Sequence, residues 1–452
     1  MAKSGDGGAD KHIIVFSYPA PGHISPHINF SRLLISRGLK VTVILTPSYR
    51  QMLDPSDSIN LLVLPVNDSP VTADFPFFTK MRGLRELHNP IVDWFKVQKS
   101  PPIAIVSDAF LGWTHHLADQ LSIPRLAFYT SGVSDSLVSY LLWRDMPEKD
   151  TSPEDDLLVS FPTAPNCPKY HWWQIGHLYK DYKEGDPDCE AFRDGMLNNL
   201  LAWGIIFNSF TELEGVYIDH VKKLAGHDRV WAVGPLLSPD HGLRLRLGED
   251  LSAWLDDKPE NSVVYICFGS HFMLTKEQME DLAGALCWSE VHFIWVVNDR
   301  IKGQEEIGYG EIPVGLEDTV GSKGFVIRGW APQVAILRHR AVGTFLTHCG
   351  WNSVMEGLME GVVMLTWPID GDQFTNAKLL VDQLGVAVQA CEGGIRCRPD
   401  LTKLVPLLFE SVTKNQPERA RVREMQAAAK RVAKGSSGSL DQLVNQIKEF
   451  NI

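Results

Sequence analysis

Two polar residues follow strand-like runs in the first half of the chain. His23 lies in the Pro/Gly-rich stretch SYPAPGHISP after the run His12–Ser17, and Asp108 closes the run Ile103–Asp108. Ligands of parallel α/β sheets bind beyond the carboxyl ends of the strands, so both side chains are expected at one sheet edge. If the strands lie close together, Asp108 can accept from one imidazole nitrogen and leave the other free to take a proton. A general base of this kind deprotonates an alcohol or phenol and contributes about 10² to 10⁴-fold in rate.

Each of these residues also has a simpler interpretation. A single histidine in a turn is more often solvated, or a capping residue, than a base. Asp108 could equally be the N-cap of a helix that begins near Phe110. Neither residue identifies the chemistry by itself.

The region Trp330–Gln373 in the second half carries more information. Its apolar run AVGTFLT leads into a tight His-Cys-Gly turn, and a helix is expected from about Trp351. A helix N-terminus after a glycine turn offers free backbone N–H groups and the positive end of the helix dipole, which suit a diphosphate. The residues placed to hold it are His348, Gly350, Asn352 and Ser353.

Two further residues of this region suit a nucleoside. Glu356 lies four residues after Asn352 on the same helix face, and its carboxylate can accept from both ribose hydroxyls. Trp330 precedes Ala331-Pro332, and Pro332 suits the first turn of a helix. An indole there can stack on a flat base, for about 1 to 3 kcal/mol. Individually such residues are also typical of a core or a helix cap, and only their combination favours a nucleotide site.

Parallel α/β sheets are expected to position these residues. The first half alternates short apolar runs with helical stretches, which is typical of a doubly wound sheet. Its strands are expected at His12–Ser17, Lys40–Thr46, Ile103–Asp108 and Arg125–Thr130, with helices at Pro26–Arg37 and Leu111–Leu121. The stretch Lys149–Asp188, rich in Pro, Asp, Tyr and Trp, is expected to be a long loop over this sheet.

A second α/β series begins at Val263 and ends near Val388. We therefore predict two Rossmann-like, doubly wound domains that face a central cleft. The first is residues 1–237, a linker follows at 238–250, and the second is residues 251–437. The final helix, 438–452, is expected to pack back on the first domain.

Composition narrows the partners and the compartment. The net charge of −12 opposes a polyanion-binding surface, so no nucleic acid partner is expected. The seven cysteines show no CxxC spacing, which favours reduced thiols and a cytoplasmic protein. The first apolar run, Ile13–Phe16, is too short for a signal or membrane segment, so no membrane insertion is expected. We expect a monomer.

These residues carry a resemblance to a known family. Trp330–Gln373 is similar to the signature box of plant secondary-product UDP-glycosyltransferases, in its opening WAPQ, its central HCGWNS, its glutamate and its closing DQ. The resemblance extends over essentially the whole chain, from the turn Gly22–Pro26 to the C-terminal helix. The stretches SDAFLGWT and LLWRDMP resemble a branch that contains flavonol 7-O-rhamnosyltransferases. The resemblance implies a GT-B fold and an inverting single displacement at the anomeric carbon, without a metal.

The family's roles carry over to the matching positions. His23 and Asp108 match the catalytic pair, and Trp330 would stack on uracil. The backbone of Ala331 would also contact the base, and Gln333 and Glu356 would bind the ribose. The diphosphate would be held by His348, Asn352, Ser353 and Ser270, and the sugar hydroxyls by Thr130, Trp351, Asp372 and Gln373.

Donor and acceptor are less defined. Gln373 favours UDP-glucose, because an amide that donates and accepts at once suits vicinal hydroxyls, and UDP-rhamnose is the alternative. The expected acceptor is a planar phenolic, first a flavonoid, in an apolar slot lined by Phe16, Phe110, Trp143 and Trp172. A non-catalytic nucleotide-sugar-binding protein is the competing class, and the intact His23 and Asp108 oppose it.

Three details stand outside this pattern. Asp370-Gly371-Asp372 spells a DxD, but two carboxylates are a weak metal signal, and no cofactor besides the UDP-sugar co-substrate is expected. His271 stands where relatives commonly carry Gln, and could alter contacts near the diphosphate or acceptor. Gly361-Val362-Val363 replaces the frequent Gly-Val-Pro, which we interpret as a packing change.

Overall fold

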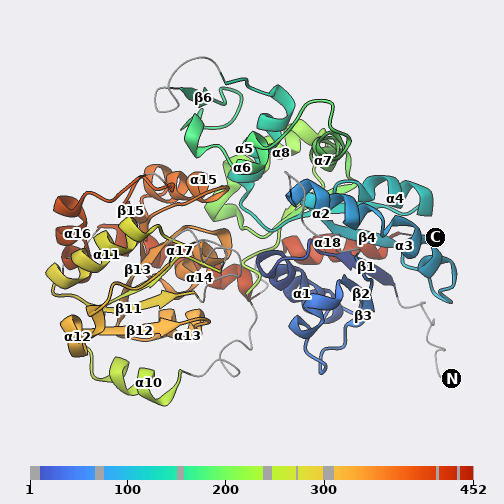
Figure 1. The fold of residues 1–452 in the computed structure, drawn as a ribbon. Coiled ribbons are helices and arrows are strands. Elements are labelled where there is room, and N and C mark those ends of the chain that lie inside the picture. Colours follow the sequence, from blue (N-terminus) through green and yellow to red (C-terminus); the bar gives the residue numbers. More distant parts are fainter. Residues whose placement is uncertain are drawn as a thin grey trace, which may run out of the picture.

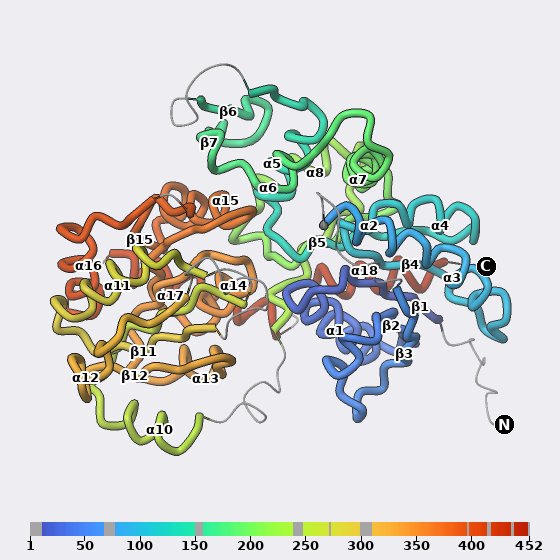
Figure 2. Tube along the Cα trace, viewed as in Figure 1, coloured from blue at the N-terminus to red at the C-terminus, as the bar shows by residue number. Residues whose placement is uncertain are grey.

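The computed structural model describes residues 11–66, 76–149, 157–237, 247–270, 273–298, 310–395, 397–413, 417–434 and 438–450. Two α/β bodies lie side by side, one from each half of the chain, and a green segment with β6 and α6 lies above the gap between them (Figure 1). The tube trace shows the same division, with blue and cyan on one side and yellow and orange on the other (Figure 2). Most of the predicted linker and His271 fall outside the described residues.

The N-terminal body is built on a seven-stranded sheet in the order β3-β2-β1-β4-β5-β8-β9. All neighbouring strands in it are parallel, which confirms the expected doubly wound sheet. Because β1 and β4 are direct neighbours, the segments that follow them meet at the same edge. The strands are β1 (His12–Phe16), β2 (Lys40–Leu45), β3 (Asn60–Val63), β4 (Ala104–Asp108), β5 (Arg125–Tyr129), β8 (Gly204–Phe207) and β9 (Val230–Ala232).

Helices cover both faces of this sheet, and β1 shows why its whole run is apolar. Ile13 and Val15 pack in a core with residues of α1, whereas Ile14 and Phe16 belong to the core on the other face. The helices are α1 (Pro21–Ile35), η1 (Pro47–Met52), α2 (Pro76–Arg85), α3 (His88–Lys96), η2 (Ala109–Leu111), α4 (Thr114–Leu121), α5 (Val133–Asp145), α7 (Pro187–Asn198), η4 (Asn199–Leu201) and α8 (Thr211–Ala225).

The first helix begins earlier than expected. We expected it at Pro26, but α1 starts at Pro21, so His23 lies in the first helical turn rather than in a preceding loop. Pro21 suits this start because proline is favoured in the first turn, where its missing N–H would have no partner. Pro26 lies inside the helix and leaves the carbonyl of Gly22 without its usual donor.

The segment expected to be a loop contains regular structure. Between residues 157 and 186, β6 (Leu158–Ser160) and β7 (Lys169–His171) form an antiparallel pair, followed by η3 (Trp172–Gln174) and α6 (His177–Lys180). Burial of Tyr170 and Trp172 fixes this insertion against the rest of the body. Residues 150–156 of the predicted loop lie outside the described residues.

The C-terminal body repeats the architecture with a six-stranded parallel sheet in the order β12-β11-β10-β13-β14-β15. Its strands are β10 (Val263–Cys267), β11 (His292–Val297), β12 (Gly324–Arg328), β13 (Val342–Thr347), β14 (Val363–Thr366) and β15 (Ala387–Gln389). Its helices are α10 (Glu249–Asp256), α11 (Lys276–Trp288), α12 (Leu316–Val320), η5 (Gly321–Lys323), α13 (Gln333–Arg338), α14 (Trp351–Glu360), α15 (Gln373–Lys378), η6 (Leu379–Gln383), α16 (Leu401–Thr413) and α17 (Pro417–Ala433).

The last helix, α18 (Ser439–Lys448), returns to the N-terminal body, where it lies in red beside the blue strands (Figure 1). Leu443 and Ile447 are buried in the same core as β1 and α1. Asp441 pairs with Arg37 at 2.6 Å, and Lys448 donates to the Arg37 carbonyl. Among the described residues, no helix combines the length and the apolarity needed to cross a membrane.

Candidate active site

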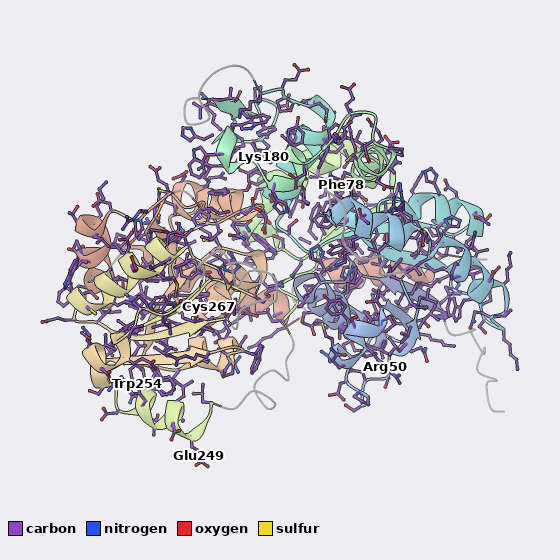
Figure 3. The ribbon with its side chains drawn as sticks, viewed as in Figure 1. Arg50, Phe78, Lys180, Glu249, Trp254 and Cys267 are labelled. Carbon is purple, nitrogen blue, oxygen red and sulfur yellow. The ribbon has the colours of Figure 1, made fainter. Side chains whose placement is uncertain are left out.

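A cavity of about 480 Å³ lies where the two bodies meet, and both of them line it. In Figure 3, Phe78 marks the N-terminal body and Cys267 marks the end of β10 in the opposite one. Ser270 follows Cys267 closely and reaches the lining. The carboxyl ends of the two sheets therefore open onto a common space, which is where ligands of such sheets bind.

His23 and Asp108 meet at the wall of this cavity. The Nδ1 atom of His23 lies 2.8 Å from Oδ2 of Asp108, because α1 follows β1 and Asp108 ends the adjacent β4. Asp108 is only 1% exposed. Burial alone would raise the pKa of this carboxyl, but the charge and hydrogen bond of His23, the charge of His27 and the bond from the Phe110 N–H together lower it below its ordinary value. With Nδ1–H donating to the carboxylate, Nε2 can accept a proton.

Asp108 makes two contacts at once. Its Oδ1 accepts from the backbone N–H of Phe110 at 3.0 Å and caps η2, while Oδ2 faces His23. The Oγ1 of Thr130 lies 3.2 Å from the same imidazole nitrogen. The rings of Tyr18 and Phe110 flank the His23 ring, with centroids at 5.1 and 5.0 Å. Sequence patterns gave no indication of Tyr18.

The expected diphosphate residues come together at the start of α14. Gly350 is the N-cap of α14, and it lines the cavity with Ser270, His348, Asn352 and Ser353. Glycines on both sides make room for the imidazole, since a Cβ at Gly269 or at Gly350 would lie 2.5 Å from Nε2 of His348. The first N–H groups of a helix have no intrahelical partners and lie at the positive end of its dipole, so the start of α14 suits an anion.

Asn352 has a second role that the sequence did not indicate. Its Nδ2 donates to the carbonyl of Gly22 at 3.0 Å, across the boundary between the bodies. This carbonyl lacks a helical donor because Pro26 has no N–H. Asn352, in the region Trp330–Gln373 of the C-terminal body, thus completes the hydrogen bonding of the helix that carries His23.

The residues that were expected to bind the nucleoside lie beside the cavity. Gln333 donates to Oε2 of Glu356 at 2.6 Å and to Oγ of Ser353 at 3.0 Å. Burial raises the pKa of Glu356 to about 7, although the bond from Gln333 lowers it. Trp330 is 70% exposed, which leaves a large aromatic ring available for stacking. Gln333, Glu356, Trp330 and Ala331 do not line the cavity. Ser353 does line it, and it connects this group to the cavity through its bond with Gln333.

The cavity is lined by all four residues that were expected to contact the sugar hydroxyls: Thr130, Trp351, Asp372 and Gln373. Their chemistry differs from the expectation in two places. The amide oxygen of Gln373 already accepts from the backbone N–H groups of Ile369 and Asp370, so this amide can offer only its NH₂ group. The indole N–H of Trp351 donates to the Asn208 carbonyl at 2.7 Å and is not available to a sugar.

The two aspartates of the DxD stretch have separate partners. Asp370 forms a hydrogen bond with the imidazole of His177 in α6. The carboxylate of Asp372 accepts a hydrogen bond from the side-chain amide of Asn376 at 2.8 Å. Within the described ranges, no group of three or more His, Cys, Asp and Glu side chains could hold a metal ion.

Two of the four expected acceptor residues lie elsewhere. Phe16 is fully buried against Trp113 and does not line the cavity, because β1 points it into the sheet's core. Trp172 is likewise buried in the insertion, near Tyr179, and outside the lining.

Phe110 and Trp143 do line the cavity as expected. Phe192 of α7 also lines the cavity, although no sequence pattern indicated it. The centroid of its ring lies 5.9 Å from that of Phe110 and 5.6 Å from that of Trp143. α7 lies far along the chain from both partners, and the apolar pattern there gave no signal of the contact. The three rings form an apolar wall beside His23.

Comparisons with known proteins identify the family. The UDP-glucoronosyl and UDP-glucosyl transferase family matches residues 243–403. The flavonol 3-O-glucosyltransferase UGT89B1 of Arabidopsis thaliana is 45% identical over 92% of this chain and 91% of its own. A flavonol 7-O-rhamnosyltransferase of the same plant is 34% identical over 96% of this chain and 98% of its own.

Solved structures give the same result for the fold. Arabidopsis thaliana UGT89C1, solved with UDP-L-rhamnose and with quercetin, superposes with a TM-score of 0.75 at 32% identity. The match covers 97% of this chain and 99 to 100% of that one. The chain therefore belongs to the plant family 1 UDP-glycosyltransferases, related to the branch of the flavonol 7-O-rhamnosyltransferases, and it has their GT-B fold.

Proposed function

We propose that this enzyme transfers a sugar, glucose in preference, from a UDP-sugar to a hydroxyl of a flavonoid or similar planar phenolic. His23 acts as the base and Asp108 holds it in position. The observation that carries the proposal is the 2.8 Å contact between His23 and the buried Asp108 at the wall of a cavity that also contains the donor residues. The N-terminal body would present the acceptor and the C-terminal body the donor.

The reaction is a single displacement in which every proton has a destination. Nε2 of His23 takes the proton of the acceptor hydroxyl as its oxygen attacks the anomeric carbon. The bond from that carbon to the phosphate oxygen breaks, and UDP leaves with the electron pair. Asp108 stabilises the imidazolium that forms, and the N-terminus of α14 stabilises the charge on the departing diphosphate. Attack opposite the leaving group inverts the anomeric centre.

One observation supports a glucosyl donor: the flavonol 3-O-glucosyltransferase relative is named for glucose. UDP-rhamnose is the second candidate, because another relative is named a rhamnosyltransferase and UGT89C1 was solved with UDP-L-rhamnose. For the acceptor, the wall of Phe110, Trp143 and Phe192 suits a flat aromatic molecule, and both relatives are named for flavonols.

A donor-by-acceptor matrix tests this function. UDP-glucose, UDP-galactose, UDP-xylose and UDP-rhamnose are each incubated with flavonols, simple phenols, benzoates and terpenoid alcohols, and products are read by mass spectrometry. We expect the strongest conversion for UDP-glucose with a flavonol. Dominant transfer of rhamnose would overturn the donor assignment. UDP binding without any product would instead indicate a non-catalytic nucleotide-sugar-binding protein.

Chelation is expected to leave the rate of transfer unchanged. The helix N-terminus already offers positive potential to the diphosphate, and Asp370 and Asp372 are each bonded to another side chain. Initial rates are measured after dialysis against EDTA and again after addition of Mn²⁺ or Mg²⁺. A collapse in EDTA that Mn²⁺ reverses would show that the DxD stretch binds a catalytic metal.

A further inference from the structure

The first turn of α5 presents a carboxylate to the cavity. Asp135 lies between the buried Ser134 and Ser136, but is itself only half-buried and lines the cavity. The nearby hydroxyls of Ser131 and Thr375 lower the pKa of this carboxyl, although burial raises it more. Thr375 belongs to α15 of the opposite body, so Asp135 lies at the boundary between the bodies, close to the turn that carries Asp372.

Asp135 and Asp372 both line the cavity, and the charge of His23 acts on Asp372. The charged groups that act on Asp135 are Asp372 and Glu214, both acidic. Burial and these neighbours raise the pKa of Asp135 well above its ordinary value, and burial raises that of Asp372 to about 6. Two such carboxylates are stabilised by O–H donors, which a bound molecule with several hydroxyls would supply.

Glu214, the third acid, is already fully used. It accepts from the backbone N–H groups of Val133 and Ser134 at 2.9 and 2.8 Å, and from the Ser209 hydroxyl at 2.6 Å. These bonds cap the N-terminus of α5 and fix the turn that carries Asp135. Glu214 is absent from the cavity lining. Its role is therefore structural, and Asp135 and Asp372 are the acids that face the ligand space.

A hydrogen-bond donor faces the same end of the cavity. Gln373 is 3% exposed, its oxygen is occupied by two backbone N–H groups, and its NH₂ group has no partner among the described residues. An amide donor that faces a cavity can bond an acceptor of a bound molecule. Two carboxylate acceptors and one amide donor thus converge, and a sugar hydroxyl can donate and accept at once.

We propose that Asp135 is a donor-specificity residue, whose carboxylate, together with that of Asp372, accepts hydrogen bonds from sugar hydroxyls of the UDP-sugar. This inference rests on the proposed function and adds a contact from the N-terminal body to the donor. A site that accepts from a hydroxyl discriminates against donors that lack it, since one hydrogen bond to the carboxylate is then lost. One bond to a charged group corresponds to about 10- to 100-fold in discrimination.

The test compares Asp135→Asn with the parent enzyme. The values of kcat/KM are measured with three donors: UDP-glucose, UDP-xylose and UDP-rhamnose. Xylose lacks the hydroxymethyl group of glucose, and rhamnose lacks the 6-hydroxyl. The asparagine keeps the shape of the side chain but loses the charge. We expect kcat/KM for UDP-glucose to fall about 10- to 100-fold, and the preference for glucose over at least one of the other donors to fall about 10-fold. Calorimetric affinity for UDP alone should stay unchanged.

Asp145→Asn is the matched control. Asp145 lies at the other end of the same helix, is exposed, pairs with Arg144 and does not line the cavity. Asp135→Glu keeps the charge and serves as a second variant if the asparagine variant is poorly folded. Unchanged donor ratios in both Asp135 variants that still bind UDP would overturn this inference alone. A parent enzyme that transfers none of the three sugars would overturn the proposed function instead.

Discussion

His23→Ala is expected to lower the rate of transfer to a weakly acidic hydroxyl by about 10² to 10⁴-fold, with UDP affinity nearly intact. The imidazole contacts Asp108 and the rings of Tyr18 and Phe110, and among the described residues no hydrogen bond joins its side chain to the region Trp330–Gln373. The bond between the bodies at this point uses the Gly22 carbonyl, which the substitution keeps. Loss of the side chain thus removes the proton acceptor and leaves the donor site.

The measurement combines single-turnover rates with calorimetric titration of UDP. Phenols of graded acidity sharpen it, because an acidic phenol needs less help with its proton and should lose less rate. His115→Ala is the matched control, since His115 lies in the same body, outside the cavity, and pairs with Asp119. An equal loss of UDP binding and of transfer would show that His23 supports the fold of the site and would contradict its role as base.

Much of the fold could be predicted because its strands are buried on both faces. Such strands appear in the sequence as unbroken apolar runs, and β1, β4 and β10 were located by these runs alone. The donor box was similarly accessible, because the start of α14, its glycine turn and its polar residues lie within a short stretch. Local patterns suffice when the residues that meet in space are also neighbours in sequence.

The same property explains the expectations that failed. An apolar run covered on both faces does not show which face looks toward a cavity, so Phe16 could not be separated from residues that line it. Pro26 indicated a helix start because its missing N–H is costly inside a helix. The partner that makes its internal position tolerable, Asn352, lies in the other body. Contacts of this kind have no local sequence signal.

Asp135 illustrates the limit most clearly. In the sequence it is one acid in the polar stretch TSGVSDS, and nothing there relates it to Asp372. Asp135 and Asp372 lie close together for two reasons. Glu214 caps the start of α5, and Thr375 of the C-terminal body lies beside Asp135. The proposed contact of Asp135, in the N-terminal body, with the sugar donor can therefore be inferred only from the structure and not from the sequence.

Asp108→Asn is expected to lower the rate of transfer by about 10² to 10⁴-fold while leaving the fold intact. The reason is the second bond of Asp108. The backbone N–H of Phe110 requires an acceptor at the position of Oδ1, so the amide oxygen of the asparagine should take that place. Its NH₂ group then faces Nδ1 of His23, which must accept, and the ring proton moves to Nε2. An imidazole in that tautomer cannot take a proton from the acceptor.

Comparison with Asp108→Ala separates this tautomer effect from loss of structure. Alanine removes both the partner of His23 and the cap of η2, and loss of an N-cap costs about 1 kcal/mol of stability. The melting temperature should therefore fall for alanine and stay near that of the parent enzyme for asparagine, while both variants lose turnover. UDP affinity should be unchanged in both. An asparagine variant with nearly normal turnover would mean that Asp108 only positions the His23 ring, because an amide can replace the carboxylate in that task but cannot support the charged imidazolium.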